Sequence, residues 1–479
     1  MGSAGGDLAP MDRPSQGLVD YALSLSNNPL LDRQVDAVVT HLLDTTACAL
    51  GGYRSPPAVI ARRIARSVVA DDGATVLGMA TRTTPEYAAF ANSVMVRYLD
   101  YNDLGPAGHP SDMIPATWAV AEQSRATGMD VVKATFAIYE VMAAIGRNGG
   151  HVLGAREKGI DQVFVPVGAA VGAGVLLGLS PEQFGHAISL SLVPNIPLRV
   201  TRTGRLSAWK GCATADGAMR GVWAARLAKE GMTGPSEPFD GVDGLRQVIG
   251  IEVDSLEDIG QPVDGLSAIE ASALRYFPAE FGSQGTLETV LQMLPRFDVA
   301  DIERIHIAVF YSAWHEIGGG QGDHDEKWDP QTRETADHSL PYLVAAALTD
   351  GEFTVDSLAP ERIADPSLRP LMDKIEVDPD PELTRAFEKE GVFDSEWPSI
   401  VTVELKDGSR ISERSSYPKG MPRNPMSEVE VASKFKKMSE GVMTPGQSES
   451  LVNAVRGLPG QESVTDLFAL FRQVDDGHG

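Results

Sequence analysis

"VFVPVGAAVGAGVLLGL", residues 163–179, is the most apolar run of this 479-residue chain. Its length lies at the short limit for a membrane-spanning helix. With Pro166 and four glycines, the run is more typical of a helix that is buried among closely packed neighbours. It therefore predicts a buried helix inside a globular domain.

The segments on either side of this run also have helical periodicity. "VDAVVTHLLDTTACALGG" (35–52) has apolar residues three to four positions apart and ends at a glycine pair, which favours a helix stop. "TPEYAAFANSVMVRYLDY" (84–101) and "SPEQFGHAISLSL" (180–192) each begin with a hydroxyl residue and a proline, a common way to start a helix. This part of the chain is expected to be α-rich.

The pattern changes after about residue 270. "IERIHIAVFY" (302–311) and "KIEVDPD" (374–380) are typical of strands, and "SIVTVELKDGSRISERS" (399–415) predicts a hairpin around Asp-Gly. Helical patterns lie between these strands, and an amphipathic helix follows from about residue 425. We therefore predict a mainly α protein with a large all-helical domain and a smaller α+β lid domain. The expected boundaries are a flexible tail at 1–17, the helical domain at 18–270 with 415–479, and the lid at 271–414.

Charge and cysteine content exclude several classes of function. The chain has 41 Lys and Arg against 66 Asp and Glu, a formal charge of −25, which disfavours nucleic acid or an anionic membrane as a partner. Two cysteines, Cys48 and Cys212, are too few for a disulfide framework or for a thiolate-held iron–sulfur cluster. No secretory pattern is visible at the N-terminus, so a cytoplasmic protein is expected.

One candidate site is "YLDYNDLGPAGHPSDM" (98–113). Asp100 and Asp103 are expected on one face at the end of a helix, where the dipole raises the pKa of a carboxyl group. His109 is expected beside the next helix N-terminus, capped by Ser111 and Asp112, where backbone N–H groups favour an anion and disfavour imidazolium. The segment predicts either proton transfer beside an anion site or only a capped turn with solvated acids.

A second candidate is the basic segment "PLRVTRTGRLSAWKG" (197–211). It carries four cations and no acid in a strongly acidic chain, and a helix of small residues follows it. Guanidinium groups bind carboxylates through two hydrogen bonds, and a lysine adds a movable proton donor. The segment predicts either a carboxylate-binding site or a solvated or dimer-forming basic surface. The four cations are Arg199, Arg202, Arg205 and Lys210.

Three further segments contain polar residues that could belong to a site. "RYFPAEFGSQGTLETV" (275–290) places Arg275 and Gln284 among aromatics and glycines. "WDPQTRETADHSLPYLVAAAL" (328–348) places His338 before an apolar helix, as a cap or as an acid–base residue. "HEIGGGQGDHDE" (315–326) has two histidines, but their spacing fits no standard zinc site, and the chain has no phosphate-binding loop motif. No metal is expected.

The combined pattern resembles the MmgE/PrpD family over roughly residues 18–440. The matching segments, in order, are "LDYNDLGPAGHPSDM" (99–113), "GIDQVFVPVGAAVGAGVLLGLS" (159–180), "FPAEFGSQ" (277–284), "ADHSLPYLVAAALTDGEFT" (336–354) and "YPKGMPRNPMSEVEVASKF" (417–435). The resemblance implies a helical domain built from both chain ends, an α+β lid, a cofactor-independent site between them and usually a homodimer.

The resemblance also assigns residues and shows departures. Asp100 and His109 match family active-site positions, and Tyr342 matches a tyrosine that lines the site. The loop before His109 is shorter than the family pattern, Leu206 stands where a lysine is common, and Gly282 stands where the motif has a histidine. A further family histidine is replaced by Asp161-Gln162.

These segments together predict a cofactor-independent lyase for a small di- or tricarboxylate, resembling 2-methylcitrate dehydratase. Removing water from a β-hydroxy carboxylate requires a base, an acid and cations that stabilise negative charge. Epimerisation or decarboxylation of a related acid, and a non-catalytic family member, remain open as alternatives. The expected catalytic residues are Asp100, His109, Tyr342 and Lys210; the expected substrate-binding residues are Arg202, Arg205, Arg275, Gln284, His338 and Asp103.

Overall fold

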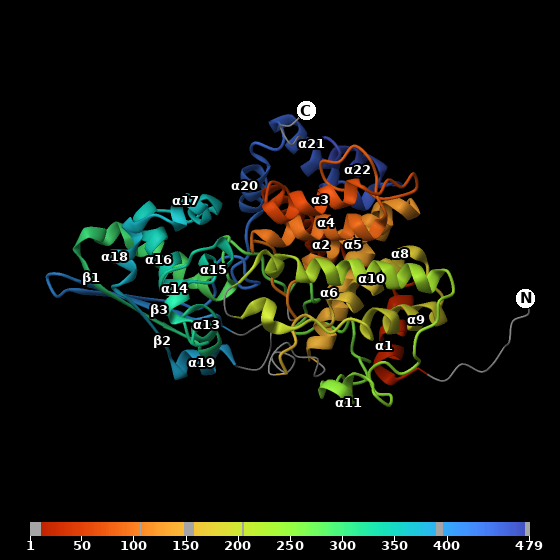
Figure 1. Cartoon of the computed structure of the whole chain (residues 1–479), viewed down its shortest axis with the longest axis horizontal. Helices are drawn as coiled ribbons and strands as arrows, with labels where there is room; N and C mark the ends of the chain where they lie inside the picture. The colour runs from red at the N-terminus through yellow and green to blue at the C-terminus, as the bar shows by residue number, and fades with distance from the viewer. Residues whose placement is uncertain (1–10, 106, 148–157, 204–205, 389–395, 475–479) are drawn as a thin grey trace, which may run out of the picture.

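The structure is a computed structural model that describes residues 11–105, 107–147, 158–203, 206–388 and 396–474. It is mainly α, as the sequence predicts, with one small sheet. Figure 1 shows a helical body and, beside it, a smaller body that contains the sheet. The helices of the helical body are α1 (Arg13–Ser24), α2 (Asp32–Gly52), α3 (Pro56–Arg66), α4 (Pro85–Tyr98), α5 (Ile114–Ser124), α6 (Gly128–Arg147), α8 (Val165–Leu177), α9 (Pro181–Leu192), α10 (Ala213–Lys229), α11 (Leu245–Ile249), α20 (Glu428–Ser439), α21 (Pro445–Arg456) and α22 (Thr465–Phe471).

The apolar run at 163–179 contains α8, and the prediction of a buried helix is confirmed. α8 packs against α10, α6, α5 and α9. The approach to α10 requires a glycine, because a Cβ on Gly221 would lie 2.5 Å from the Ala169 Cβ and from the Pro166 carbonyl oxygen. No helix in the described ranges is both long and apolar enough to cross a membrane.

The predicted helix ends are also confirmed. α2 ends at Gly52, where a Cβ would lie 2.0 Å from the Met95 carbonyl oxygen of α4, so the glycine permits two helices to touch. Thr84 and Pro85 begin α4. Ser180 begins α9 with a full capping box, since its hydroxyl accepts from the Gln183 N–H and the Gln183 side chain accepts from the Ser180 N–H.

The smaller body contains a four-stranded sheet in the order β2-β1-β3-β4. β1 pairs parallel with β2 and antiparallel with β3, and the predicted hairpin joins β3 to β4 through a turn with Gly408 at φ 83°. Its elements are α12 (Gln284–Met293), β1 (Ile302–Val309), α13 (Tyr311–Ile317), α14 (His324–Trp328), α15 (Arg333–Ala336), α16 (Leu340–Asp350), α17 (Pro360–Ile363), α18 (Arg369–Met372), β2 (Ile375–Pro379), α19 (Pro381–Phe387), β3 (Ser399–Leu405) and β4 (Arg410–Ser415).

Buried apolar side chains form two large clusters. The first takes its residues from 18–274 and 431–474, and the second from 277–403. α20 and α21 pack against α2, and α22 adds residues to the same apolar cluster, so the C-terminal part of the described chain returns to the helical body (Figure 1). The exact domain boundaries stay predictions. The expectation that the smaller body opens and closes over the site, as a lid does, also stays a prediction.

Candidate active site

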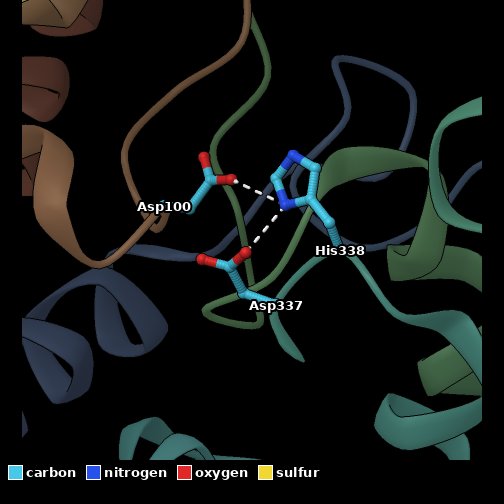
Figure 2. Close-up of side chains that lie close together, drawn as sticks. All are labelled: Asp100, Asp337 and His338. Carbon is cyan, nitrogen blue, oxygen red and sulfur yellow. Dashed lines mark hydrogen bonds and ion pairs between the residues drawn. The ribbon is translucent and has the colours of Figure 1, made fainter. Parts of the chain in front are cut away.

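Four ionisable side chains meet between the two bodies. Lys210 lies at the centre, with its Nζ 2.6 Å from Asp337 Oδ1, 2.9 Å from His338 Nδ1 and 3.9 Å from Asp100 Oδ2. His338 Nδ1 is 2.8 Å from Asp337 Oδ1 and 3.6 Å from Asp100 Oδ2, and Figure 2 shows both carboxylates facing this nitrogen. Asp100 and Lys210 come from the helical body, while Asp337 and His338 come from the smaller one. The Asp100–Lys210–Asp337–His338 cluster is the candidate active site.

Asp100 is oriented by an unusual backbone conformation. α4 ends at Tyr98, and Asp100 has φ 48°, in the left-handed region that non-glycine residues seldom occupy. The prediction that Asp100 and Asp103 share a helix face is therefore wrong. The strained turn directs the Asp100 carboxylate to Arg97, with which it forms an ion pair, and to Arg275 Nη1 at 3.0 Å.

The charges around Asp100 also reverse the predicted direction of its pKa. Burial works to raise the pKa of this carboxyl group, but Arg275, Arg97 and Lys210 hold the pKa well below its ordinary value. Asp100 is thus an ionised carboxylate, and its Oδ2 accepts no hydrogen bond from the described protein. That oxygen faces Lys210 and His338.

Lys210 lies in the short 3₁₀ helix η3 (Ala208–Gly211), which feeds into α10. Its side chain is nearly buried, and its Nζ also donates to the Glu334 carbonyl oxygen at 3.0 Å. Burial lowers the pKa of this ammonium group, while Asp337 and Asp100 oppose the shift. A lysine with a lowered pKa among carboxylates gives up a proton more readily than an exposed lysine.

Asp337 and His338 lie between α15 and α16. Arg333 of α15 contacts Asp337 Oδ2 at 3.2 Å and donates to the Tyr98 and Leu99 carbonyl oxygens at 2.7 and 2.8 Å, so it ties the smaller body to the end of α4. Burial works to raise the pKa of Asp337, but the charges of Lys210 and His338 outweigh it and lower the pKa to about 2. Asp337 is therefore ionised at neutral pH.

His338 is the part of the cluster nearest to solvent, with a side chain that is 16% exposed. Burial and the Lys210 charge lower the pKa of His338 to about 4, so the ring is neutral at pH 7. If Nδ1 carries the proton, it donates to Asp337 Oδ1, and Nε2 is left as the proton acceptor. Figure 2 shows Nε2 pointing away from both carboxylates. The sequence analysis assigned His338 to substrate binding; the geometry also suits it to proton abstraction.

His109 lies beside the cluster and is held by the backbone. Its Nδ1 is 2.7 Å from the Asp103 carbonyl oxygen, and the charges that act on its pKa are those of Arg97, Arg275 and Asp100. Burial, followed by the two arginines, holds the pKa of His109 well below its usual value. The sequence analysis predicted a disfavoured imidazolium here; the direction agrees, but burial rather than a helix end is the main cause.

Asp103 supports this loop instead of facing the cluster. Its carboxylate accepts from the Tyr139 hydroxyl at 2.6 Å and from the Ser111 hydroxyl and N–H, and burial raises its pKa. These bonds saturate Asp103, so a direct contact with substrate is not supported. Ser111 and Asp112 also do not cap α5; they lie inside the 3₁₀ helix η1 (Pro110–Met113), which precedes it.

The structure places the side chains of two other predicted site residues outside the cluster. Tyr342 is buried in the apolar cluster of the smaller body and donates its hydroxyl to the Ser357 carbonyl oxygen at 2.6 Å. Gln284 uses its side-chain amide on its own loop: it accepts from the Tyr276 and Phe277 N–H groups and donates to the Phe277 and Ala279 carbonyl oxygens. Both side chains stabilise the fold.

The basic segment is only partly brought to the site. Its Lys210 is in the cluster, whereas Arg202 pairs with Asp161 at 3.0 Å and Arg199 with Glu316 at 3.7 Å. The Arg202 charge acts on the pKa values of both Lys210 and Asp112, so it lies near the cluster. Arg205 lies outside the described residues.

Gly282 stands where the family motif has a histidine. Helix α13 occupies the space into which a larger side chain would extend. A Cβ on Gly282 would lie 3.0 Å from the Ala313 Cβ of α13 and 2.9 Å from Glu280 Oε2. Glu280 caps this turn by accepting from the Gly282 N–H at 2.6 Å, and burial, followed by the charge of Glu316, raises its pKa to about 7. A histidine would require α13 to move.

The prediction that the site holds no metal stays a prediction, and the position of Lys210 is the physical argument for it. Among the described residues, the one group of three close potential ligands is Asp100, Asp337 and His338, and the Lys210 ammonium already contacts all three. His315 and His324 instead stack on Tyr311 and Trp328. A divalent cation would have to displace a buried, hydrogen-bonded ammonium group.

Prolonged incubation with a chelator is therefore expected to leave turnover unchanged. The measurement is the initial rate before and after dialysis against EDTA, with the metal content determined by elemental analysis. A loss of activity that added metal restores would contradict this assignment and would favour a metal bound by Asp100, Asp337 and His338.

Three residues of the site escaped the sequence analysis. Arg97 precedes Asp100 by one helical turn, Arg333 precedes Asp337 by four positions, and Asp337 is adjacent to His338. The spacing of each Arg–Asp pair, three or four residues, was a usable signal for an ion pair. Nothing in the spacing showed that the two pairs would converge on Lys210.

The fold and the cluster define a mainly α protein with a buried acid–base site at the boundary of two hydrophobic cores. Residues 16–254 match the model of the MmgE/PrpD N-terminal domain, and residues 277–458 match that of the MmgE/PrpD C-terminal domain. The chain belongs to the MmgE/PrpD family, and the resemblance seen in the sequence is confirmed.

Relatives in this family cover most of the chain at low identity. The chain is 28% identical over 442 residues to a 2-methylcitrate dehydratase of Salmonella typhi, with 86% of each chain covered. It is 28% identical over 458 residues to the 2-methylcitrate dehydratase of Escherichia coli, with 89% of each covered. It is 25% identical over 459 residues to the human cis-aconitate decarboxylase, with 92% of this chain and 91% of the relative covered.

Proposed function

We propose that this protein is a hydro-lyase that removes water from a small hydroxylated di- or tricarboxylate, in the manner of 2-methylcitrate dehydratase. The observation that carries the proposal is the contact of a neutral histidine and a buried lysine, His338 Nδ1 and Lys210 Nζ, at 2.9 Å between two ionised aspartates. The names of the bacterial relatives support the reaction class.

The charge balance of the site supports an anionic substrate. Four cations lie in or against the cluster: Lys210, Arg97, Arg275 and Arg333. They face the carboxyl groups of Asp100, Asp337 and Asp112. Burial raises the pKa of Asp112 to about 6. The surplus of positive charge in a buried region favours a ligand that brings its own carboxylates.

The proton transfers can be assigned to two atoms. Nε2 of His338 takes the proton from the carbon next to a substrate carboxylate, and the electron pair of that C–H bond forms the double bond. The hydroxyl group on the neighbouring carbon leaves with a proton from Lys210 Nζ, as water. Asp337 orients the ring and stabilises the imidazolium that forms, and Asp100 holds the ammonium group.

The starting protonation state is restored through solvent. After elimination, His338 is cationic and Lys210 is neutral. The proton taken from the substrate passes from Nε2 to water at the exposed edge of the ring, which leaves a neutral ring with its proton on Nδ1. Lys210 Nζ takes up a proton from water, which regenerates the ammonium group.

A decarboxylase or an epimerase of a related acid is the second candidate. The human relative named cis-aconitate decarboxylase aligns with 92% of this chain. Decarboxylation and epimerisation both pass through a carbanion that the same cations would stabilise. Loss of water is favoured over these reactions because it requires one proton acceptor and one proton donor, which His338 and Lys210 supply.

The first experiment is a comparison of products from the purified protein. Incubation with 2-methylcitrate is expected to give an unsaturated product, seen by ultraviolet absorbance, without release of CO₂ or formation of a stereoisomer. Citrate, malate and cis-aconitate serve as comparison substrates. Release of CO₂, or isomerisation without a change in absorbance, would contradict the dehydratase and favour a decarboxylase or an epimerase. If no acid were turned over, the result would favour a non-catalytic member of the family.

Three remaining expectations are part of this proposal: no cofactor, a homodimer and a cytoplasmic location. The smaller body is further proposed to act as a lid, because Asp100, Lys210 and Asp337 are nearly buried and a tricarboxylate needs space to reach them. Opening would separate Lys210 from Asp337 and Arg333 from the end of α4, the contacts that join the two bodies at the site.

A further inference from the structure

A buried lysine in the C-terminal helix α20 reaches the loop that carries Asp100. Lys434 Nζ donates to the Tyr101 carbonyl oxygen at 2.7 Å and to the Arg275 carbonyl oxygen at 3.1 Å. Tyr101 directly follows Asp100, and Arg275 is the residue whose Nη1 pairs with Asp100 at 3.0 Å. One ammonium group therefore binds the backbone beside both members of the Asp100–Arg275 pair.

The ammonium group of Lys434 is buried and has several partners. Its side chain is 2% exposed, and Nζ lies 2.6 Å from Asp44 Oδ1 of α2. It also lies 3.7 Å from the centre of the Tyr101 ring, a favourable cation–π arrangement. Burial of an ammonium group is costly unless it is paired and hydrogen-bonded, and Asp44 and the two carbonyl oxygens supply those contacts.

Further bonds close a ring of contacts around the same pair. The Tyr101 hydroxyl donates to the Tyr276 carbonyl oxygen at 2.9 Å, and Arg275 Nη1 donates to the Asn102 carbonyl oxygen at 3.0 Å. The 101–102 and 275–276 segments are thus joined by two direct hydrogen bonds and by one bridge, in which Lys434 Nζ donates to both segments. Lys434 is the member of this ring that connects it to α2 and α20.

We propose that Lys434 of α20 is a positioning residue. Its hydrogen bonds to the backbone beside Asp100 and Arg275 fix the distance and the angle between these two side chains. Lys434 does not contact the substrate; it acts through Asp100, which in turn holds Lys210. The kinetic readout of this inference rests on the proposed function, but its structural readout does not. In the absence of Lys434, the Tyr101 and Arg275 carbonyl oxygens have no common donor and repel each other.

The test uses three variants of the full chain. Lys434→Met removes the ammonium group and leaves Asp44 buried without its cation, which threatens folding. The double variant Asp44→Asn/Lys434→Met removes both charges. No buried carboxylate is then left without a cation, so this variant is expected to fold. Lys437→Met is the matched control, because Lys437 lies on the same helix, pairs with Glu440 at 3.7 Å and has a side chain that is 52% exposed.

The double variant is expected to fold, with kcat at least about tenfold below wild type and KM within about threefold, because small misplacements of a catalytic group reduce turnover without removing a substrate contact. Lys437→Met is expected to match wild type in both constants. A folded double variant with kcat within about twofold of wild type would overturn the inference, whatever its melting temperature.

A crystal structure of the double variant separates this inference from the proposed function. The Asp100–Arg275 contact, 3.0 Å in this structure, is expected to lengthen or to change its partner atoms. An unchanged contact would overturn the inference even if the wild-type protein turned over none of the acids tested. Lack of wild-type turnover together with a displaced Asp100 would instead overturn only the proposed function.

Discussion

Replacing Lys210 with methionine is expected to lower turnover by about 10³-fold or more, the upper part of the range for loss of one acid–base group. Methionine keeps the length and the apolar stem but removes the proton donor for the leaving hydroxyl. It also removes the cation that contacts Asp100, Asp337 and His338 together. The measurement is kcat and kcat/KM at pH 7 on the substrate identified by product analysis.

The variant should remain folded, because each aspartate keeps another cation: Asp100 keeps Arg97 and Arg275, and Asp337 keeps Arg333. Thermal unfolding followed by circular dichroism checks this. Lys229→Met, at the exposed end of α10, is the control and is expected to retain full activity. If Lys210→Met kept more than about a tenth of wild-type turnover while folded, Lys210 would not be the proton donor.

Replacing His338 with glutamine is expected to cost about 10²–10³ in turnover and to change the pH dependence. The amide can still bond to Asp337 and Lys210, but it cannot accept a proton. In the wild type, the neutral ring is the active form, so kcat/KM should stay level as the pH falls from 7 and decline as the pH passes through about 4, the pKa of His338. The residual activity of the glutamine variant should lack that decline.

Each acid incubation is checked by returning a sample to pH 7, which separates protonation of His338 from unfolding. His306→Gln is the control, because His306 lies on the exposed face of β1 and pairs with Asp378 at 3.0 Å. An unchanged acidic decline in His338→Gln would transfer the proton-acceptor role to another group. His109, held by the Asp103 carbonyl oxygen beside Asp100, would then be the next to replace.

The elements of the fold were predictable because their signals are local. Small and apolar residues marked α8, hydroxyl–proline pairs marked the starts of α4 and α9, and an Asp-Gly turn marked the β3–β4 hairpin. These features depend on neighbours within a few positions of the chain, which a sequence displays directly.

Most residues of the site could be predicted from the sequence, but only part of their arrangement in space could be. Asp100, His109, Lys210, Arg275 and His338 were named from motifs, and the structure brings them together. The direction in which a side chain points could not be predicted in the same way. Tyr342, two residues into α16, turns toward the apolar core, and the positive φ of Asp100 cancels the helical face that its spacing with Asp103 implied.

The pKa of Asp100 shows why the electrostatics could not be predicted from spacing. The sequence analysis considered only the helix dipole, a modest effect. The structure adds Arg97 from one turn away, Lys210 from 110 positions on and Arg275 from 175 positions on. Contacts between distant residues outweigh the local effect, and no single segment of the chain contains them.

The position of Lys434 has a consequence for how the protein is made. Asp100 is synthesised long before α20, and its ion-pair partners emerge from the ribosome in the order Arg97, Lys210, Arg275. Until residue 434 has been translated and α20 has docked on α2, Asp44 lacks its cation and the loop after Asp100 lacks its donor. Docking of α20 therefore comes after every other residue of the site has been synthesised, and a chain that ends before residue 434 leaves the Asp44 carboxylate without its cation and is more exposed to proteolysis.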